Sequence, residues 1–285
     1  WTSITVPEEF GGLGFGYLGL GVVLEECGRT LTASPLLSTA VGAEAIAAGG
    51  SDAQKSELLP KVASGELLLT LAVEEGAHHN PFGAKTSATK SGDGYTVNGN
   101  KTFVIDGNIA NKVVVVARSS GNPGDRDGIT LVLVDSDGAG VNVTRTNMVD
   151  DRNSANISFD GAQGQLLGEE GKGVRVLMSG LDYERVVLSG IGTGIMAACL
   201  DEVMPYMVER KQFGQPIGSF QLMQGKIADM YTAMNSARAY VYEAGRACDR
   251  GNITRQDAAA CCLYASEQAM VQAHQAVQAM GGAGF

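Results

Sequence analysis

The apolar residues of this sequence change their spacing twice, and this change limits the chain to few folds. Before Glu66 they recur at helical steps of three and four, from Glu66 they alternate or form short runs, and after Gly173 the helical spacing returns. Gly, Asn and Asp separate the short runs, as at Asn98-Gly99-Asn100, so we expect strands joined by turns, with an exposed loop at 121–127. The predicted strands are 67–73, 85–90, 95–98, 102–105, 112–117, 129–134, 141–145 and 156–159. This series favours a compact antiparallel barrel or sandwich between two helical parts.

Helices are predicted on both sides of these strands. The N-terminal part has three, over 17–29, 37–48 and 51–63, the last with Ser51 as its N-cap. The C-terminal part has three long ones, beginning with 172–199. The second carries an apolar stripe, and the third begins near Thr254, which forms a capping pair with Asp257. We interpret the stripe as bundle core; its residues are Phe220, Met223, Ile227, Met230, Met234, Ala237 and Val241.

One carboxylate, Glu184, interrupts the apolar stripe of the first long helix. The other five members of that stripe are aliphatic: Leu177, Leu181, Leu188, Ile191 and Ile195. An ionised carboxylate on a buried stripe is costly unless it is paired or protonated, so Glu184 is a candidate functional residue. The plainer alternative is that it lies at an edge of the helix or pairs with a distant Arg. Arg185 lies about 100° round the helix, where Asp182 is the better partner.

Composition excludes several classes of function. The net charge is −10 and basic residues form no cluster, so nucleic-acid binding is not expected. The apolar runs are too short for a membrane span, and no secretory signal opens the chain. Five cysteines without C-x-x-C spacing indicate buried thiols in a reducing compartment. Three histidines make a metal site improbable. Because the chain begins with Trp1 rather than Met, we expect it to be a fragment.

Five motifs, in this order along the chain, resemble those of the acyl-CoA dehydrogenase family of flavoproteins. They are V-P-E-E-F-G-G at 6–12, L-E-E-C-G-R at 24–29, N-G-N-K-T-F-V-I-D-G at 98–107, R-K-Q-F-G-Q-P-I-G-S-F-Q at 210–221 and Q-A-M-G-G-A-G-F at 278–285. From Leu166 onward the chain is most similar to the isovaleryl-CoA dehydrogenase branch. The resemblance implies an α+β fold that is truncated at both ends. Its parts would be a helical domain at 1–65, a β-barrel at 66–165 and an incomplete helical bundle at 166–285.

The resemblance also assigns chemistry. It implies FAD-dependent dehydrogenation of a short or branched acyl-CoA, with electrons passed to an electron-transfer flavoprotein. In the isovaleryl branch the base is the Glu of the L-D-x-E-R run, which matches Glu184. That residue would take the pro-R α-proton while flavin N5 accepts a hydride from the β-carbon, giving a trans-2-enoyl-CoA. A base of this kind should be dry, with its pKa raised toward working pH. The substrate-binding residues implied are His79, Arg175, Asp182, Tyr183 and Arg185.

The cofactor residues follow from the same motifs. Arg210, Phe213 and Gln221 match residues that hold FAD across a subunit interface, which implies a homodimer or homotetramer. Further matches are Gln278, Gly281 and Gly282 near the adenine. Leu71, Val73, Phe103 and Ile105 match the two strands against which the isoalloxazine ring lies, and His79 lies in the loop that contacts flavin or substrate. Taken singly, each match has a structural explanation: Arg210 as a solvated charge at a helix end, Phe213 as a core aromatic.

Three positions depart from the family pattern. His78-His79-Asn80 replaces the usual Gly-Ser-Asp, so His79 or Asn80 must supply the missing hydrogen bond or the contact is lost. Ile105 replaces a Thr whose hydroxyl bonds near flavin N5. Arg175 replaces a Tyr near the acyl site. Three alternatives therefore stay open: a chimeric protein, a flavoprotein oxidase of the same fold, and a non-catalytic subunit that pairs with an active homologue. The compartment would be the bacterial cytoplasm or the mitochondrial matrix.

Overall fold

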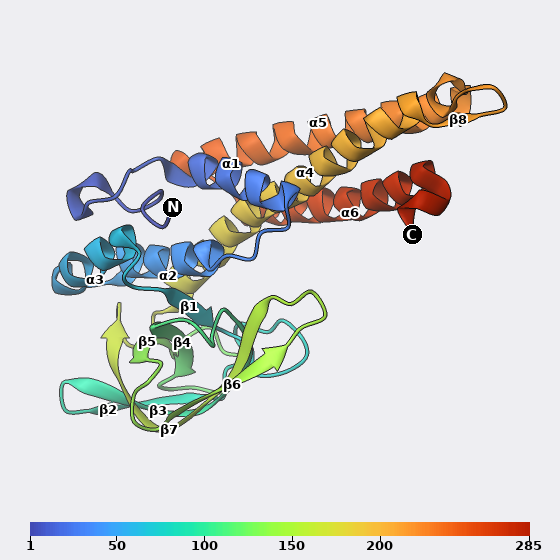
Figure 1. Cartoon of the computed structure of the whole chain (residues 1–285). Coiled ribbons are helices and arrows are strands. Elements are labelled where there is room, and N and C mark those ends of the chain that lie inside the picture. Colours follow the sequence, from blue (N-terminus) through green and yellow to red (C-terminus); the bar gives the residue numbers. More distant parts are fainter. The chain divides into compact units, whose positions relative to one another are not determined.

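The structure is a computed structural model that describes residues 1–285, and it consists of two compact units. The first comprises Trp1–Gly14 and Ala33–Leu181, and the second comprises Phe15–Thr32 and Asp182–Phe285. Helices come first, strands follow, and long helices close the chain, as the spacing of apolar residues predicted (Figure 1). The longest helix, α4 (Val174–Glu209), contributes its first residues to the first unit and the remainder to the second.

The first unit is a barrel-like sheet covered by helices α2 (Leu36–Gly49) and α3 (Asp52–Ser64). The seven strands are β1 (Leu69–Ala72), β2 (Ser87–Ser91), β3 (Gly94–Ile105), β4 (Lys112–Arg118), β5 (Ile129–Asp135), β6 (Val141–Asn147) and β7 (Asn153–Leu167). The order β4-β2-β3-β7-β5 returns to β4, which closes the sheet, while β1 and β6 add to it at β4 and β7. Most pairs are antiparallel, but β1 and β2 each pair with β4 in parallel.

Two predicted strands are in fact one. We expected a turn at Asn98-Gly99-Asn100, but β3 continues through it with a bulge, where its register with β7 shifts between Val97 and Gly99. Gly99 has φ +144°, and a Cβ atom there would clash with Thr86. The glycine is therefore needed for a close approach of two chain segments rather than for a turn. The loop at 121–127 is exposed as predicted.

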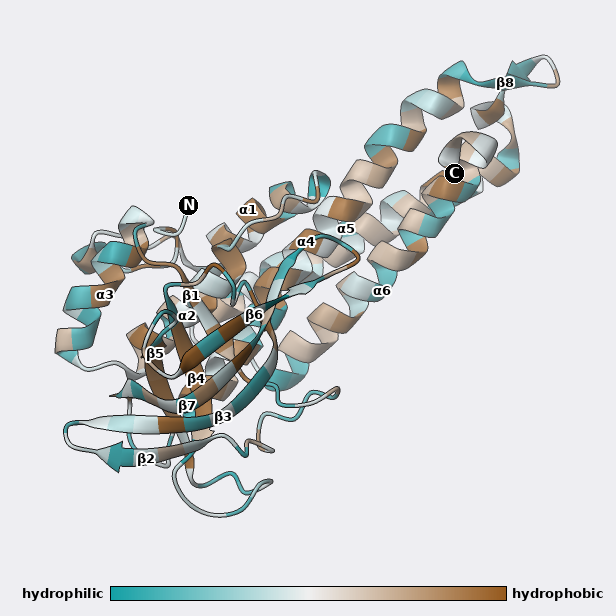
Figure 2. Cartoon of the chain, turned by 60° about the horizontal axis from the view of Figure 1, so that its bottom comes forward, coloured by the Kyte–Doolittle hydropathy of each residue, from teal (hydrophilic) through white to brown (hydrophobic).

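The apolar runs of β4 and β5 face two cores at once, and both strands are strongly apolar in Figure 2. Val113, Val115 and Val132 pack inside the barrel, whereas Val114 and Leu131 pack against the covering helices. Alternate residues of a strand point to opposite faces, so a strand buried on both faces is apolar throughout. The helix-side core also includes Leu177, Met178 and Leu181 from the first two turns of α4.

The second unit packs α1 (Gly16–Arg29), α5 (Gln221–Asp249) and α6 (Arg255–Met280) with the remainder of α4, and α4, α5 and α6 run alongside one another in Figures 1 and 2. Six of the seven residues of the predicted stripe lie in the apolar clusters of this unit, where Met230 and Ala237 are fully buried, whereas Phe220 precedes α5 and lies outside these clusters. A hairpin of β8 (Lys211–Gln212) and β9 (Gln215–Pro216) joins α4 to α5. Glycine allows α1 to cross α4 closely, because a Cβ atom on Gly194 would overlap the carbonyl oxygen of Glu25.

Local side-chain hydrogen bonds cap the starts of α3 and α6. Ser51 caps α3 in a capping box with Gln54, and the Thr254 hydroxyl accepts the Asp257 N–H at the start of α6. The start of α1 is capped instead by a distant residue: Asp249 accepts the Tyr17 N–H at 2.5 Å and the Leu18 N–H at 3.3 Å. By length and composition α4 would suffice to cross a membrane, and 61% of its apolar window is buried inside the protein.

Candidate active site

Asp182 of α4 lies at the centre of a polar cluster that includes Arg185 of the same helix and Arg255 of α6. It accepts hydrogen bonds from the guanidinium of Arg185 at 2.6 Å and from that of Arg255, on α6, at 3.3 Å. The first of these confirms the pairing predicted from the i, i+3 spacing. Tyr183 stacks on Tyr17 of α1, with ring centroids 4.2 Å apart and planes inclined by 25°. Because both Asp182 oxygens are held by guanidinium donors, Asp182 is a poor acceptor for a carbon-bound proton.

Glu184 stands between Tyr183 and Arg185 in the sequence, and it is half-buried. The expectation that all six stripe residues share a buried face is wrong: Leu177 and Leu181 are buried, but Leu188 is 38% exposed. In the second unit α4 buries another face, which includes Val186 and Val187. The reason is tertiary, since α4 packs on different neighbours before and after Leu181.

The thiol of Cys262 on α6 lies within electrostatic reach of Glu184. Burial raises the pKa of that thiol, the charge of Arg185 lowers it, and the charge of Glu184 raises it. The side chain of Glu184 therefore shares a half-buried environment with a guanidinium and a neutral thiol. Partial burial leaves a carboxylate less solvated than one on the open surface, which favours acceptance of a proton from a weak carbon acid.

The predicted flavin-facing residues gather at one rim of the barrel in the first unit. Leu71 lies in β1 and Val73 directly follows that strand, whereas Phe103 and Ile105 end β3. The ends of β1 and β3 are joined by two hydrogen bonds: the Thr102 N–H donates to the Glu74 carbonyl at 2.8 Å, and the Thr70 hydroxyl donates to the Ile105 carbonyl at 2.5 Å. Phe103 is 50% exposed and Ile105 37%. The rim thus presents an apolar surface.

His79 lies in the loop that leaves β1 and is half-exposed. Its Nδ1 is 2.6 Å from one oxygen of Glu74, whose other oxygen accepts the Asn80 N–H at 3.1 Å. Glu74 therefore holds the imidazole ring in place. Arg175 is exposed in the first turn of α4, within the first unit.

A buried ion pair supports this loop and was not foreseen from the sequence. The Lys101 side chain is fully buried; its ammonium group donates to Glu75 at 2.7 Å and to the Val73 carbonyl at 3.0 Å. Burial lowers the pKa of Lys101, while Glu75 opposes that shift. A charged residue in a strand of alternating pattern gives no sign of such burial, so the sequence held no usable signal.

A cleft of about 780 Å³, which we call the distal cleft, lies at the end of the second unit that carries the β8–β9 hairpin. It brings together five of the six residues predicted to hold the rest of the cofactor. Arg210 and Phe213 come from the β8–β9 hairpin and its approach, and Gln221 comes from the start of α5. Gly281 and Gly282 follow α6, and space around both is open to a ligand. Phe213 is 93% exposed and makes an edge-to-face contact with Phe220, so it is not a core aromatic. Gln278 does not line the cleft.

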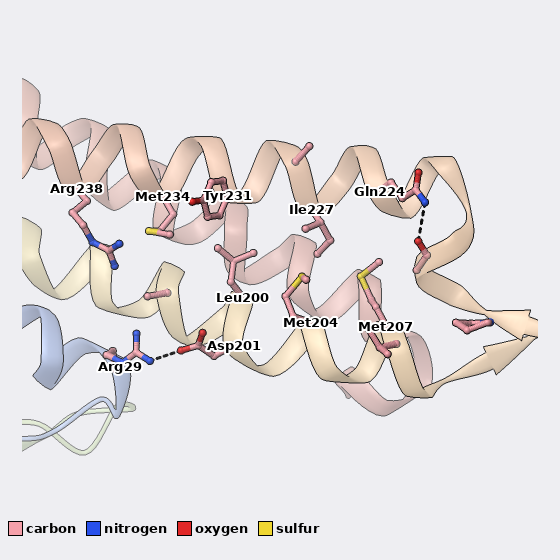
Figure 3. Close-up of a pocket in the computed structure, with 15 residues that line it drawn as sticks. Arg29, Leu200, Asp201, Met204, Met207, Gln224, Ile227, Tyr231, Met234 and Arg238 are labelled. Atoms are coloured by element: carbon pink, nitrogen blue, oxygen red, sulfur yellow. Dashed lines mark hydrogen bonds and ion pairs between the residues drawn. The ribbon is translucent and has the colours of Figure 1, made fainter.

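Another cavity, of about 980 Å³, lies between α4 and α5 and is lined by none of the predicted site residues. Figure 3 shows Leu200, Met204 and Met207 of α4 facing side chains of α5 across it. Its charged groups are already paired, since Arg29 binds Asp201 and Arg238 binds Glu25. It lacks a reactive group, and we do not assign the chemistry to it.

Comparisons with known proteins agree with these observations. Models of the acyl-CoA dehydrogenase N-terminal, middle and C-terminal domains match residues 1–66, 70–162 and 171–285. Mitochondrial isovaleryl-CoA dehydrogenase of Arabidopsis thaliana is 41% identical over 296 residues, which cover 99% of this chain and 71% of that protein. Mitochondrial 2-methylacyl-CoA dehydrogenase of Solanum tuberosum is 40% identical, with the same coverage.

Among solved structures, butyryl-CoA dehydrogenase from Megasphaera elsdenii matches all of this chain and 78% of its own, with a TM-score of 0.93 and 30% identity. The motifs, the order of helices and strands and these matches lead to one conclusion. The chain belongs to the acyl-CoA dehydrogenase family, whose members are FAD-dependent oxidoreductases acting on CH–CH groups.

Proposed function

We propose that this protein dehydrogenates a short, branched acyl-CoA to the trans-2-enoyl-CoA, with Glu184 as the base. Two of its relatives are named for isovaleryl-CoA and 2-methylacyl-CoA, which supports a branched substrate. One observation carries the assignment of the base. Of the two neighbouring carboxylates on α4, Asp182 is held by two guanidinium groups, whereas Glu184 is half-buried beside the neutral thiol of Cys262. Both oxygens of Asp182 are thus committed to guanidinium groups, and the half-buried Glu184, which matches the family's base, is the candidate for proton abstraction.

The residues on hand fit FAD. The apolar rim at Phe103 and Ile105 offers a surface for a planar ring, and the distal cleft offers a guanidinium for a pyrophosphate beside open glycine backbone. We propose that Arg210, Phe213 and Gln221 hold the FAD of a partner subunit. When bound, FAD supplies the hydride acceptor, and an electron-transfer flavoprotein would reoxidise it.

In this reaction the protein itself removes one proton from the substrate and keeps it on Glu184. Glu184 takes the α-proton as the α-carbon–hydrogen bond breaks, and its carboxylate becomes a neutral acid. The electron pair of the broken α-carbon–hydrogen bond forms the α,β double bond, and the β-hydrogen would leave with its own electron pair as a hydride to FAD. Asp182 keeps Arg185 in place beside this reaction. We propose the mitochondrial matrix as the location in a eukaryote and the cytoplasm in a bacterium.

To test whether Glu184 is the base, the bound flavin is reduced anaerobically with isovaleryl-CoA, and the loss of flavin absorbance is measured. Glu184→Gln should keep the flavin and lose reduction by at least about 10³-fold, because an amide cannot accept the α-proton. Glu202→Gln is the matched control, an exposed glutamate of the same helix. Equal rates for Glu184→Gln and the wild type would exclude Glu184.

Two additions to this measurement, oxygen after the reduction and FAD before it, separate the alternatives. Rapid reoxidation of the reduced flavin by oxygen alone would indicate an oxidase. A protein that stays colourless after FAD is added would indicate a non-catalytic subunit.

A further inference from the structure

The rim segment Phe103–Asp106 is held in an unusual backbone shape. Phe103 has φ +54° and Asp106 has φ +55°, so two non-glycine residues flank the rim in the left-handed region. L-residues avoid this region because the Cβ atom crowds the backbone. Such a conformation persists only where the surroundings enforce it. The positions of the exposed Phe103 and Ile105 side chains therefore depend on the contacts that hold this segment.

Hydrogen bonds hold both ends of the segment. The Phe103 N–H donates to the Asn156 side chain at 3.1 Å, and the Asp106 N–H donates to the Asn153 carbonyl at 3.0 Å. The one side-chain bond that ties the segment to a helix is different in kind. Ser38, in the first turn of α2, donates its hydroxyl to the carboxyl group of Asp106 at 2.6 Å.

The carboxyl group in this bond is buried: Asp106 is only 6% exposed. Burial raises the pKa of Asp106, and the Ser38 hydroxyl and the charge of Arg152 offset the shift only in part. Arg152 is the charged group that acts on it. The neighbours from α2 and β7, Ser38, Asn153 and Ser154, are uncharged. Burial therefore disfavours the ionised form of this carboxyl group relative to that of an exposed carboxyl.

We infer that Asp106 is a proton-dependent positioning residue: its neutral carboxyl group holds the Phe103–Ile105 rim in shape, and its ionisation loosens the rim. The contribution is fully present below the ordinary carboxyl pKa and is lost as pH rises through the raised value. In that window the opened segment releases a proton that the closed segment retains. The opening equilibrium should rise about tenfold for each unit by which the closed pKa exceeds the open one. That the rim contacts flavin rests on the proposed function; the opening itself does not.

The test is hydrogen–deuterium exchange of peptides covering 103–110 in the full chain, from about pH 4.5 to pH 7.5, after correction for intrinsic rates. Asp106→Asn keeps an acceptor for Ser38 and removes the ionisation. Its protection should not change with pH, whereas that of the wild type should fall. Ser38→Ala removes a donor that favours the ionised form and should steepen the fall. Strand β5 (Ile129–Asp135), buried in the sheet, is the internal control.

FAD affinity over the same pH range gives the second readout, and it should weaken with pH in the wild type but not in Asp106→Asn. Identical exchange profiles for the wild type and Asp106→Asn would overturn the inference, even if the enzyme is fully active. A wild-type protein that binds no FAD would instead refute the proposed function, and the exchange data would still decide the role of Asp106. If Asp106→Asn does not fold, a flat wild-type profile or an unchanged Ser38→Ala profile refutes the inference.

Discussion

Removing the buried ammonium group of Lys101 should destabilise the barrel more than any surface substitution. Lys101→Met leaves the Glu75 carboxylate, 17% exposed, without its ammonium partner, while the backbone N–H groups of Lys85 and Thr86 still donate to it at 2.7 and 2.9 Å. It also leaves the Val73 carbonyl without its ammonium donor. Breaking a buried pair on one side costs about 3–5 kcal/mol. Because two donors to Glu75 remain, we expect the lower end, about 3 kcal/mol.

The assay is urea unfolding monitored by far-UV circular dichroism. The control is Lys90→Met, which changes an exposed lysine of β2. The control should change stability by no more than about 0.5 kcal/mol. The double variant Lys101→Met/Glu75→Gln should recover about 1–3 kcal/mol relative to the sum of the single changes, since it removes the unpaired charge. A Lys101→Met cost below about 1 kcal/mol, or strict additivity in the double variant, would refute the reasoning.

Two further predictions concern the second unit. Arg210→Met should weaken FAD binding about 10- to 100-fold, because it removes a charged donor from the distal cleft. The control Arg250→Met, which breaks a pair with Glu243, should leave the FAD affinity unchanged. Fluorescence titration with FAD measures both affinities, and equal values would remove Arg210 from the cofactor site. Gly194→Ala should cost at least about 1–3 kcal/mol of unfolding free energy, because its Cβ would overlap the Glu25 carbonyl where α1 crosses α4. Gly225→Ala, in α5 with open space around it, should be neutral or stabilising, and a similar effect for both in thermal melts would contradict the close crossing.

The sequence by itself predicted what depends on neighbours within about four residues. The N-terminal helices begin and end within one residue of the predicted bounds, the Ser51 and Thr254 caps form, and Asp182 pairs with Arg185 three positions on. These features follow from local hydrogen bonds and from the period of apolar residues, which the sequence shows directly. The family motifs likewise pointed to the residues of the distal cleft.

Tertiary structure decided what depends on segments far apart in the chain. Asp182 gains a second guanidinium from Arg255, and Asp249 caps α1 from more than two hundred residues away. Asn98-Gly99-Asn100 is a bulge rather than a turn because Thr86 lies against Gly99. The burial of Lys101, and a face of α4 that excludes Leu188 from the core, have the same origin. A side chain's burial is set by which elements pack on it, and no spacing rule within one helix or strand contains that information.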